Sequence, residues 1–200
     1  MDYFFDVNRW YNVEALHTRS MNCGYCNHRV AAHLGYSWRS PYSPDQNAYI
    51  YICPNCGNPI LEYPYRGFTF PGPRIGYDVI NIEDKMVASL YEEARNCFAA
   101  NALTGSVLCC RKILMHVAVS KGAKEGHGFT YYAEFLSTNH FVPPGAEKWV
   151  KTIKDRGNEA NHQIKISEKS EAEMILLFTG MLLKNVFEFP SMSENFKDGQ

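Results

Sequence analysis

Four of the seven cysteines stand as two Cys-x-x-Cys pairs, Cys23 with Cys26 and Cys53 with Cys56. Two residues between thiolates allow both sulfurs to face one tetrahedral metal ion, and residues 27–52 can carry the chain between two such knuckles as a hairpin. The second pair lies in Cys-Pro-Asn-Cys-Gly-Asn, which supplies the small, turn-forming residues that a knuckle requires. We therefore predict a zinc ribbon with one structural zinc ion per chain, because four thiolates leave no coordination position for water or substrate.

Other interpretations of the cysteines explain less. Four reduced thiols would give the spacing no role, and one redox-active pair would leave the other pair unexplained. His28 and His33 lie close enough to replace a cysteine, although a polar surface position suits both better. The odd cysteine count and the absence of an apparent secretion signal argue against a disulfide framework. The three remaining cysteines, all within helical apolar patterns, are Cys97, Cys109 and Cys110.

The role of such a ribbon is open at this level. Ribbons bind nucleic acid, bind proteins, or hold together a segment too small to fold alone. Basic and aromatic residues alternate around the first knuckle and could hold phosphates and stack bases; they are Arg19, Arg29 and Arg39 with Tyr25, Tyr36 and Trp38. Residues 1–80, however, carry six basic and six acidic side chains, so they produce no strong field. We favour the structural role.

A second group of candidate residues is the segment Arg-Gly-Asn-Glu-Ala-Asn-His, from Arg156 to His162. Gly157 and Asn158 tolerate a left-handed helix terminus, so one interpretation is a helix C-cap with Arg156 beside the helix dipole. The other is catalytic, because a guanidinium can stabilise a phosphorane and a neutral imidazole can take or return a ribose hydroxyl proton. Asn158 could orient either group. Composition alone favours the cap.

Length and composition limit the elements that must position these groups. The 200 residues are 46% hydrophobic and 20% charged, with a net charge of −1, which suits one domain with a small satellite and excludes a globally basic nucleic-acid binder. No signal peptide is apparent, and the most apolar stretch, residues 174–183, is too short to span a bilayer. We expect a cytoplasmic protein that does not contact a membrane.

The sequence changes character near residue 64, and we predict a mainly α protein with a small β-rich zinc ribbon in front. The expected parts are a ribbon region at 1–63, a Pro/Gly-rich linker at 64–81, a helical bundle at 82–190 and a flexible tail at 191–200. Residues 48–52 alternate as a strand does. Five helices are expected, over about 83–100, from the N-cap Thr104 to Gly122, over 130–137, over 143–157, and from the capping box at Ser170 to Pro190.

Several features of the second half occur together in an order that resembles a known family. They are Tyr91-Glu92-Glu93-Ala94, Arg111, the segment from Arg156 to His162, and Phe187-Glu188-Phe189-Pro190. Together they resemble a bacterial domain-of-unknown-function family of the HEPN-like superfamily, seen alone, behind zinc ribbons and fused to restriction-system subunits. The resemblance covers about residues 82–190.

The resemblance implies a four- to five-helix bundle that commonly forms a homodimer. In active HEPN proteins an Arg-(four to six residues)-His motif from each subunit meets at the dimer interface and cuts RNA without metal. Arg156 and His162 fit this window, and Asn158 lies one position later than the polar residue of the most typical motif. The implied function is a metal-independent endoribonuclease or RNA-binding protein of phage defence, restriction or stress response.

Two alternatives follow from the same resemblance. Some superfamily members are inactive and bind substrates or scaffold other proteins, so a non-catalytic module for protein or nucleic-acid interaction is the rival function. Glu93 and Arg111 could join the catalytic site, since charges on otherwise apolar helix faces need partners. Equally, they could form a buried ion pair that fixes helix packing.

Overall fold

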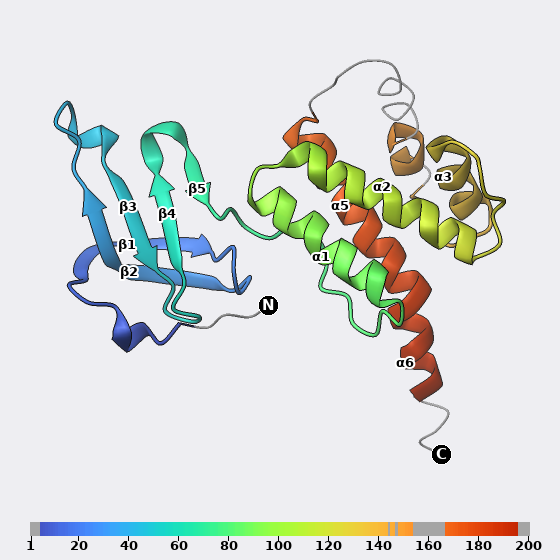
Figure 1. Cartoon of the computed structure of the whole chain (residues 1–200), viewed down its shortest axis with the longest axis horizontal. Helices are drawn as coiled ribbons and strands as arrows, with labels where there is room; N and C mark the ends of the chain where they lie inside the picture. Colours follow the sequence, from blue (N-terminus) through green and yellow to red (C-terminus); the bar gives the residue numbers. More distant parts are fainter. Residues whose placement is uncertain (1–4, 144, 147, 154–166, 196–200) are drawn as a thin grey trace. The chain divides into compact units, whose positions relative to one another are not determined.

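The chain forms two compact units in a computed structural model that describes residues 5–143, 145–146, 148–153 and 167–195 (Figure 1). The first, which we call the ribbon unit, comprises the chain up to Arg74 together with Ala99–Asn101. The second, the helical unit, begins at Ile75 and takes the rest. The candidate residues Arg156, Asn158 and His162 lie outside the described residues.

The ribbon unit is built on a five-stranded antiparallel sheet in which each strand pairs with the next along the chain. The strands are β1 (Glu14–Asn22), β2 (Arg29–Trp38), β3 (Ala48–Ile52), β4 (Pro59–Tyr63) and β5 (Phe68–Phe70). The register of β1 against β2 shifts between Ala15 and Arg19, so the pairing of the two strands is irregular there. The two cysteine knuckles are the turns between β1 and β2 and between β3 and β4.

The predicted fold class, mainly α, is wrong. The described residues combine a five-stranded sheet with helices, so the protein is mixed α/β. Most of β1 is exposed, and its sequence therefore lacks the alternation of apolar and polar residues that reveals a half-buried strand. The last strand, β5, lies in the Pro/Gly-rich stretch that we expected to be a linker, where it adds a short edge to β4.

The two faces of the sheet differ in chemistry. On one face Tyr51 and Ile60 are fully buried, and the Tyr51 hydroxyl lies 2.8 Å from Nε2 of His17. The Arg19 guanidinium forms an ion pair of 2.6 Å with the buried carboxylate of Glu62 on the same side. Burial, with a smaller effect from Glu62, raises the pKa of Tyr51 to about 12, so this hydroxyl stays protonated.

The helical unit contains helices in the five regions where the periodicity predicts them. They are α1 (Lys85–Ala99), α2 (Leu103–Ser120), α3 (Phe129–Thr138), a helical segment at 148–153, and α5 (Lys169–Leu183), which continues through a π-helical turn, η4 (Lys184–Glu188), into α6 (Phe189–Asn195). The predicted caps are wrong in detail. Thr104 lies inside α2, where its hydroxyl accepts a hydrogen bond of 3.2 Å from the Ser167 amide. Ser170 lies inside α5, after the N-cap residue Glu168.

The core of the helical unit forms where α2 packs against both α3 and α5 (Figure 1). Large side chains in this core are fully buried, among them Leu114, Leu136, Leu176, Phe178, Leu182 and Leu183. Among the described residues, α2 alone is long and apolar enough to span a membrane by length and composition, with a mean hydropathy of 1.3. Seven of its residues are buried, so core packing accounts for its apolar composition.

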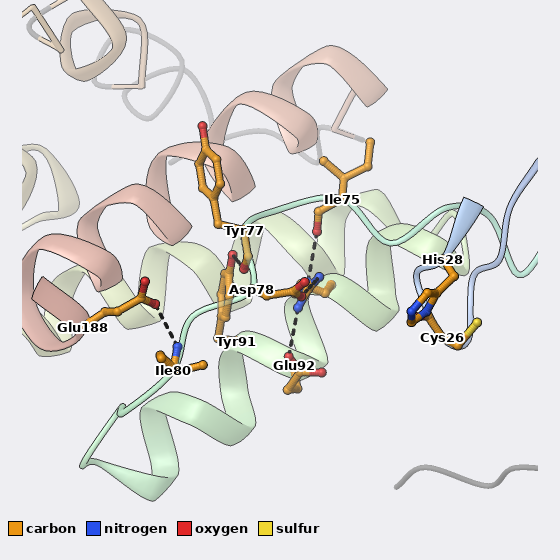
Figure 2. Close-up of polar contacts among 10 residues, drawn as sticks. Cys26, His28, Ile75, Tyr77, Asp78, Ile80, Tyr91, Glu92 and Glu188 are labelled. Carbon is orange, nitrogen blue, oxygen red and sulfur yellow. Dashed lines mark hydrogen bonds and ion pairs between the residues drawn. The ribbon is translucent and has the colours of Figure 1, made fainter. Parts of the chain in front are cut away.

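Residues 75–82, which we call the strap, lie extended along α1 and η4 (Figure 2). The Tyr91 hydroxyl donates to the Tyr77 carbonyl at 3.0 Å, and the Ile80 amide donates to Oε2 of Glu188 at 2.9 Å. The other carboxylate oxygen of Glu188 pairs with Nζ of Lys184 at 2.6 Å. Side chains from both helical segments therefore satisfy the backbone of the strap.

Arg95 on α1 binds the same strap from inside the helical unit, and only 3% of its side chain is exposed. Its Nε donates to the Ile75 carbonyl at 3.2 Å, and its terminal nitrogens pair with Asp78 at 2.7 Å and with Glu92 at 3.3 Å. The guanidinium also lies 5.8 Å from the centre of the Tyr91 ring. A buried cation needs such partners, because its desolvation would otherwise be costly.

Candidate metal centre

The two cysteine knuckles have the same backbone construction. In the first, the Asn27 amide donates to the Cys23 carbonyl at 2.9 Å, and in the second the Gly57 amide donates to the Cys53 carbonyl at 2.8 Å. Asn27 and Gly57 both adopt left-handed backbone angles, with φ of 59° and 72°. Asparagine and glycine are the residues that tolerate this conformation, which explains why each Cys-x-x-Cys turn is followed by one of them.

The fold brings the four cysteine sulfurs together, all within 4.8 Å of one another. The Sγ atoms of Cys23 and Cys56 are 3.7 Å apart, and those of Cys26 and Cys53 are 3.8 Å apart. A tetrahedron with metal–sulfur distances of about 2.3 Å has edges of about 3.8 Å. The four cysteines therefore form a possible metal site whose size suits a tetrahedral ion of the kind that thiolates bind.

The surroundings of the sulfurs are those of a thiolate cluster. The Tyr25 amide donates to the sulfur of Cys23 at 3.4 Å, and the Asn58 side-chain amide donates to the sulfur of Cys56 at the same distance. Burial raises the pKa of Cys23 and of Cys53, which disfavours their thiolates in the absence of a cation. A bound divalent ion would reverse that preference, because a metal cation stabilises thiolates.

Cys26 is the most accessible of the four sulfurs and the readiest to ionise. Burial opposes its ionisation, but hydrogen bonds, led by that from the His28 backbone, outweigh this effect and lower its pKa to about 6. The His28 ring turns back so that its Nδ1 lies 2.8 Å from the Cys26 carbonyl (Figure 2). His28 is thus exposed and bonded to the knuckle backbone, and among the described residues the sulfur cluster consists of the four cysteines alone.

Two charged residues considered for a catalytic site lie apart from each other. Arg111 on α2 stacks its guanidinium 5.0 Å from the centre of the Phe129 ring. Glu93 on α1 is exposed and lines a groove with Lys112 and His116. Among the residues that the structure describes, no ion pair joins Glu93 to Arg111. A buried arginine that does form ion pairs is Arg95. The sequence analysis missed it because its partner carbonyl in the strap is set by tertiary packing.

Fold and site together define a protein class: a ribbon that brings four cysteines together as a possible metal centre, joined to a helical unit. A family profile described as domain of unknown function DUF4145 matches residues 92–199, more than half of the chain. The chain belongs to this family. Searches of curated proteins and of solved structures found no match.

Proposed function

We propose that this protein holds one structural zinc ion in its ribbon and acts on RNA through a HEPN-like helical domain. The observation that carries the proposal is that the family match at residues 92–199 includes the whole segment from Arg156 to His162. The zinc assignment is supported by the sulfur–sulfur distances of 3.7 and 3.8 Å and by the all-thiolate ligand set. Close to one zinc per chain should be found by elemental analysis.

The proposed chemistry needs only side chains of the helical domain. The neutral imidazole of His162 takes the proton of a ribose 2′-hydroxyl, whose oxygen attacks the adjacent phosphorus. The Arg156 guanidinium stabilises the charge that develops on the phosphorane oxygens, and Asn158 orients one of these groups. The 5′-oxygen then leaves with a proton returned from the imidazolium, and a cyclic phosphate remains. The ribbon zinc takes no part, because four thiolates fill its coordination sphere.

The assembly and setting of the proposed enzyme follow the HEPN-like resemblance. The protein would be a cytoplasmic homodimer in which each subunit contributes one Arg-x₅-His segment to a shared RNA site. A role in phage defence, restriction or a stress response is the setting that this resemblance implies.

Incubation of the zinc-loaded protein with mixed RNA, without divalent metal and without chelator, tests the proposal. We expect the wild type to cleave RNA, and His162→Ala and Arg156→Ala to lose cleavage while their unfolding curves stay unchanged. Asn161→Ala, beside His162 in the same segment, is the matched control and should cleave normally. A wild type that cleaves no RNA would overturn the enzymatic proposal.

A non-catalytic interaction module is the second candidate, and one observation favours it. The ribbon sheet presents an apolar face that is exposed in the structure, as an interaction module requires. In that case the segment from Arg156 to His162 only caps a helix. His162→Ala would then change the free energy of unfolding and leave any measured activity intact.

A further inference from the structure

One face of the ribbon sheet is apolar, aromatic and open. Opposite pairs in the register place Tyr36, Ile50, Leu61 and Phe70 in one row across four strands. The next row along the strands contains Trp38, paired with Ala48, and Phe68, paired with Tyr63. Directly opposed residues in antiparallel strands point to the same face, so the two rows lie side by side. We call these side chains the aromatic face.

The exposure of the aromatic face is unusual for such residues. Trp38 is 55% exposed, Phe70 44% and Phe68 41%, and the last two rings stack with their planes 2° apart. By contrast, the opposite side of the same strands carries the buried side chains of Tyr51 and Glu62, and Glu62 pairs there with the half-exposed Arg19. Large contiguous apolar surface on a soluble domain marks an interaction site.

Within the described part of the ribbon unit, the segment around Trp10 packs at one end of this face. Trp10 packs edge-on to Tyr36 with ring centres 6.4 Å apart, and the Tyr36 hydroxyl donates to the Tyr11 carbonyl. Trp10 also closes a small apolar cavity with Leu34 and Ile52 near the second knuckle. The rings of Trp38, Phe68 and Phe70 lie beyond this contact and are exposed within the ribbon unit.

Two exposed arginines stand at the end of the aromatic face that carries Trp38 and Phe68. Neither row contains a charged side chain, and Glu62 points to the opposite face, where Arg19 neutralises it. Arg39 follows Trp38 directly and lines a groove with Glu14 and Tyr49. Arg66 precedes Phe68 by two residues, and both arginines are exposed. The loops that carry them lie together, because η2 (Pro44–Gln46) contacts η3 (Pro64–Arg66). Two exposed acids, Asp45 and Glu14, stand at the same end.

We propose that the aromatic face binds single-stranded RNA, with bases stacked on Trp38, Phe68 and Phe70 and phosphates contacting Arg39 and Arg66. Unpaired bases stack on exposed aromatic rings of a sheet irrespective of sequence, and arginines at the edge hold the backbone. This inference rests on the proposed action on RNA and adds the surface that would hold the strand. It gives the ribbon a function besides holding its own fold together.

The affinity of a fluorescently labelled oligouridine of about 12 nucleotides, measured by anisotropy, tests this surface. The full zinc-loaded chain carrying His162→Ala serves as the parent, so that the RNA stays intact during titration. Trp38→Ala and Phe70→Ala should each weaken binding by roughly five- to a hundredfold, which corresponds to the loss of one stacked base. Tyr42→Ala is the matched control, since Tyr42 is 87% exposed but lies outside both rows, and it should bind as the parent does.

Two further variants separate stacking from other causes. Phe70→Leu keeps an apolar side chain but removes the ring, so stacking predicts weaker binding and an unchanged zinc content. Arg39→Gln should reduce the slope of log affinity against log salt by about 0.7, the value for one phosphate contact on a single strand. An unchanged slope together with unchanged affinity in both variants would overturn the proposal.

The outcomes distinguish this surface from the proposed RNA chemistry. If the parent binds RNA and the variants at the aromatic face bind equally well, the surface is wrong and RNA action stands. If the wild type cleaves RNA but the parent shows no binding, the surface is again wrong. If neither binding nor cleavage occurs, both proposals fall. If Trp38→Ala and Phe70→Ala instead convert a dimer to a monomer in sedimentation, with RNA affinity unchanged, the face belongs to a second copy of the chain.

Discussion

Replacing Gly180 by alanine should destabilise the helical unit, although alanine favours helices. Gly180 lies in α5 against the strap, and a Cβ added there would meet the Tyr91 hydroxyl oxygen at 2.3 Å. The same Cβ would lie 3.1 Å from Cδ2 of the Tyr77 ring and 3.2 Å from the Tyr77 amide nitrogen. Tyr91 is 2% exposed and its hydroxyl holds the Tyr77 carbonyl, so it has little room to move.

The expected size of the effect follows from three contributions. Alanine in place of glycine within a helix stabilises it by about 1 kcal/mol. Overpacking of a rigid core costs about 1–3 kcal/mol, and displacement of the Tyr91 hydroxyl from the Tyr77 carbonyl costs about 1 kcal/mol more. The net loss in the free energy of unfolding should therefore be about 1–3 kcal/mol, opposite in sign to the helix propensity.

Urea unfolding followed by far-ultraviolet circular dichroism measures this change. The matched control is Tyr91→Phe, which loses the hydrogen bond alone and should cost about 1 kcal/mol. In the Tyr91→Phe background, Gly180→Ala no longer meets an oxygen, and its cost should shrink by at least half. Stabilisation by Gly180→Ala in the wild type would refute the close contact between α5, Tyr91 and the strap.

Three other perturbations probe the metal centre, the helix cap and the buried charges. Removal of the proposed zinc by a strong chelator should abolish the sheet signal in circular dichroism and leave the helical unit folded, because structural zinc contributes on the order of 10 kcal/mol. A sheet signal that survives the chelator would contradict this prediction. A hydrogen bond from His116, with smaller contributions from backbone amides, lowers the pKa of Asp84. The ionised Asp84 carboxylate therefore stabilises the fold above its unfolded pKa of about 3.9. This stabilisation is lost as the pH falls through the lower pKa of the folded state. Asp84→Asn should therefore flatten the acid limb of a stability profile, and an unaltered limb would exclude the contact. Arg95→Met should lower the free energy of unfolding, measured in urea, by about 1–3 kcal/mol, because it leaves the Ile75 carbonyl without its donor. An unchanged free energy of unfolding would mean that other contacts hold the strap.

The thiols of the helical unit give one more test. Burial, with a smaller effect from Glu93, raises the pKa of Cys109 to about 11. Its thiolate is therefore scarce at mildly alkaline pH, and alkylation by iodoacetamide should be more than about tenfold slower than that of a free cysteine. Mass spectrometry of the labelled peptides measures the rate, and rapid labelling would contradict the burial.

Local patterns in the sequence predict much of the fold. The spacing of the two Cys-x-x-Cys pairs is enough to predict that four sulfurs meet, because each knuckle is made within a few residues. The helix at 85–99 was expected at about 83–100, since its apolar residues recur along one face. Both signals depend on neighbours in sequence and need no knowledge of tertiary packing.

Features that depend on tertiary packing could not be predicted from the sequence. Strand β1 is mostly exposed and shows no alternation, so the sheet was underestimated and the fold class was wrong. The sequence could not identify Arg95, rather than Arg111, as the arginine that forms ion pairs, because the Ile75 carbonyl reaches Arg95 only after the strap has docked. The aromatic face needs the register of four strands, and the roles of Arg156 and His162 stay predictions.

The contact of the N-terminal segment with the second knuckle also has a consequence for folding during synthesis. The Phe5 amide donates to the Cys56 carbonyl at 2.9 Å, and the Trp10 indole donates to the Gly57 carbonyl at 2.8 Å. A Cβ at Gly57 would lie 1.9 Å from the Phe5 carbonyl oxygen, so this passage admits only glycine. Residues 5–10 emerge from the ribosome before the second knuckle, so they have no docking place until Cys53 and Cys56 have emerged and closed their turn. The N-terminal segment is thus synthesised before the second knuckle but docks only after that knuckle has formed.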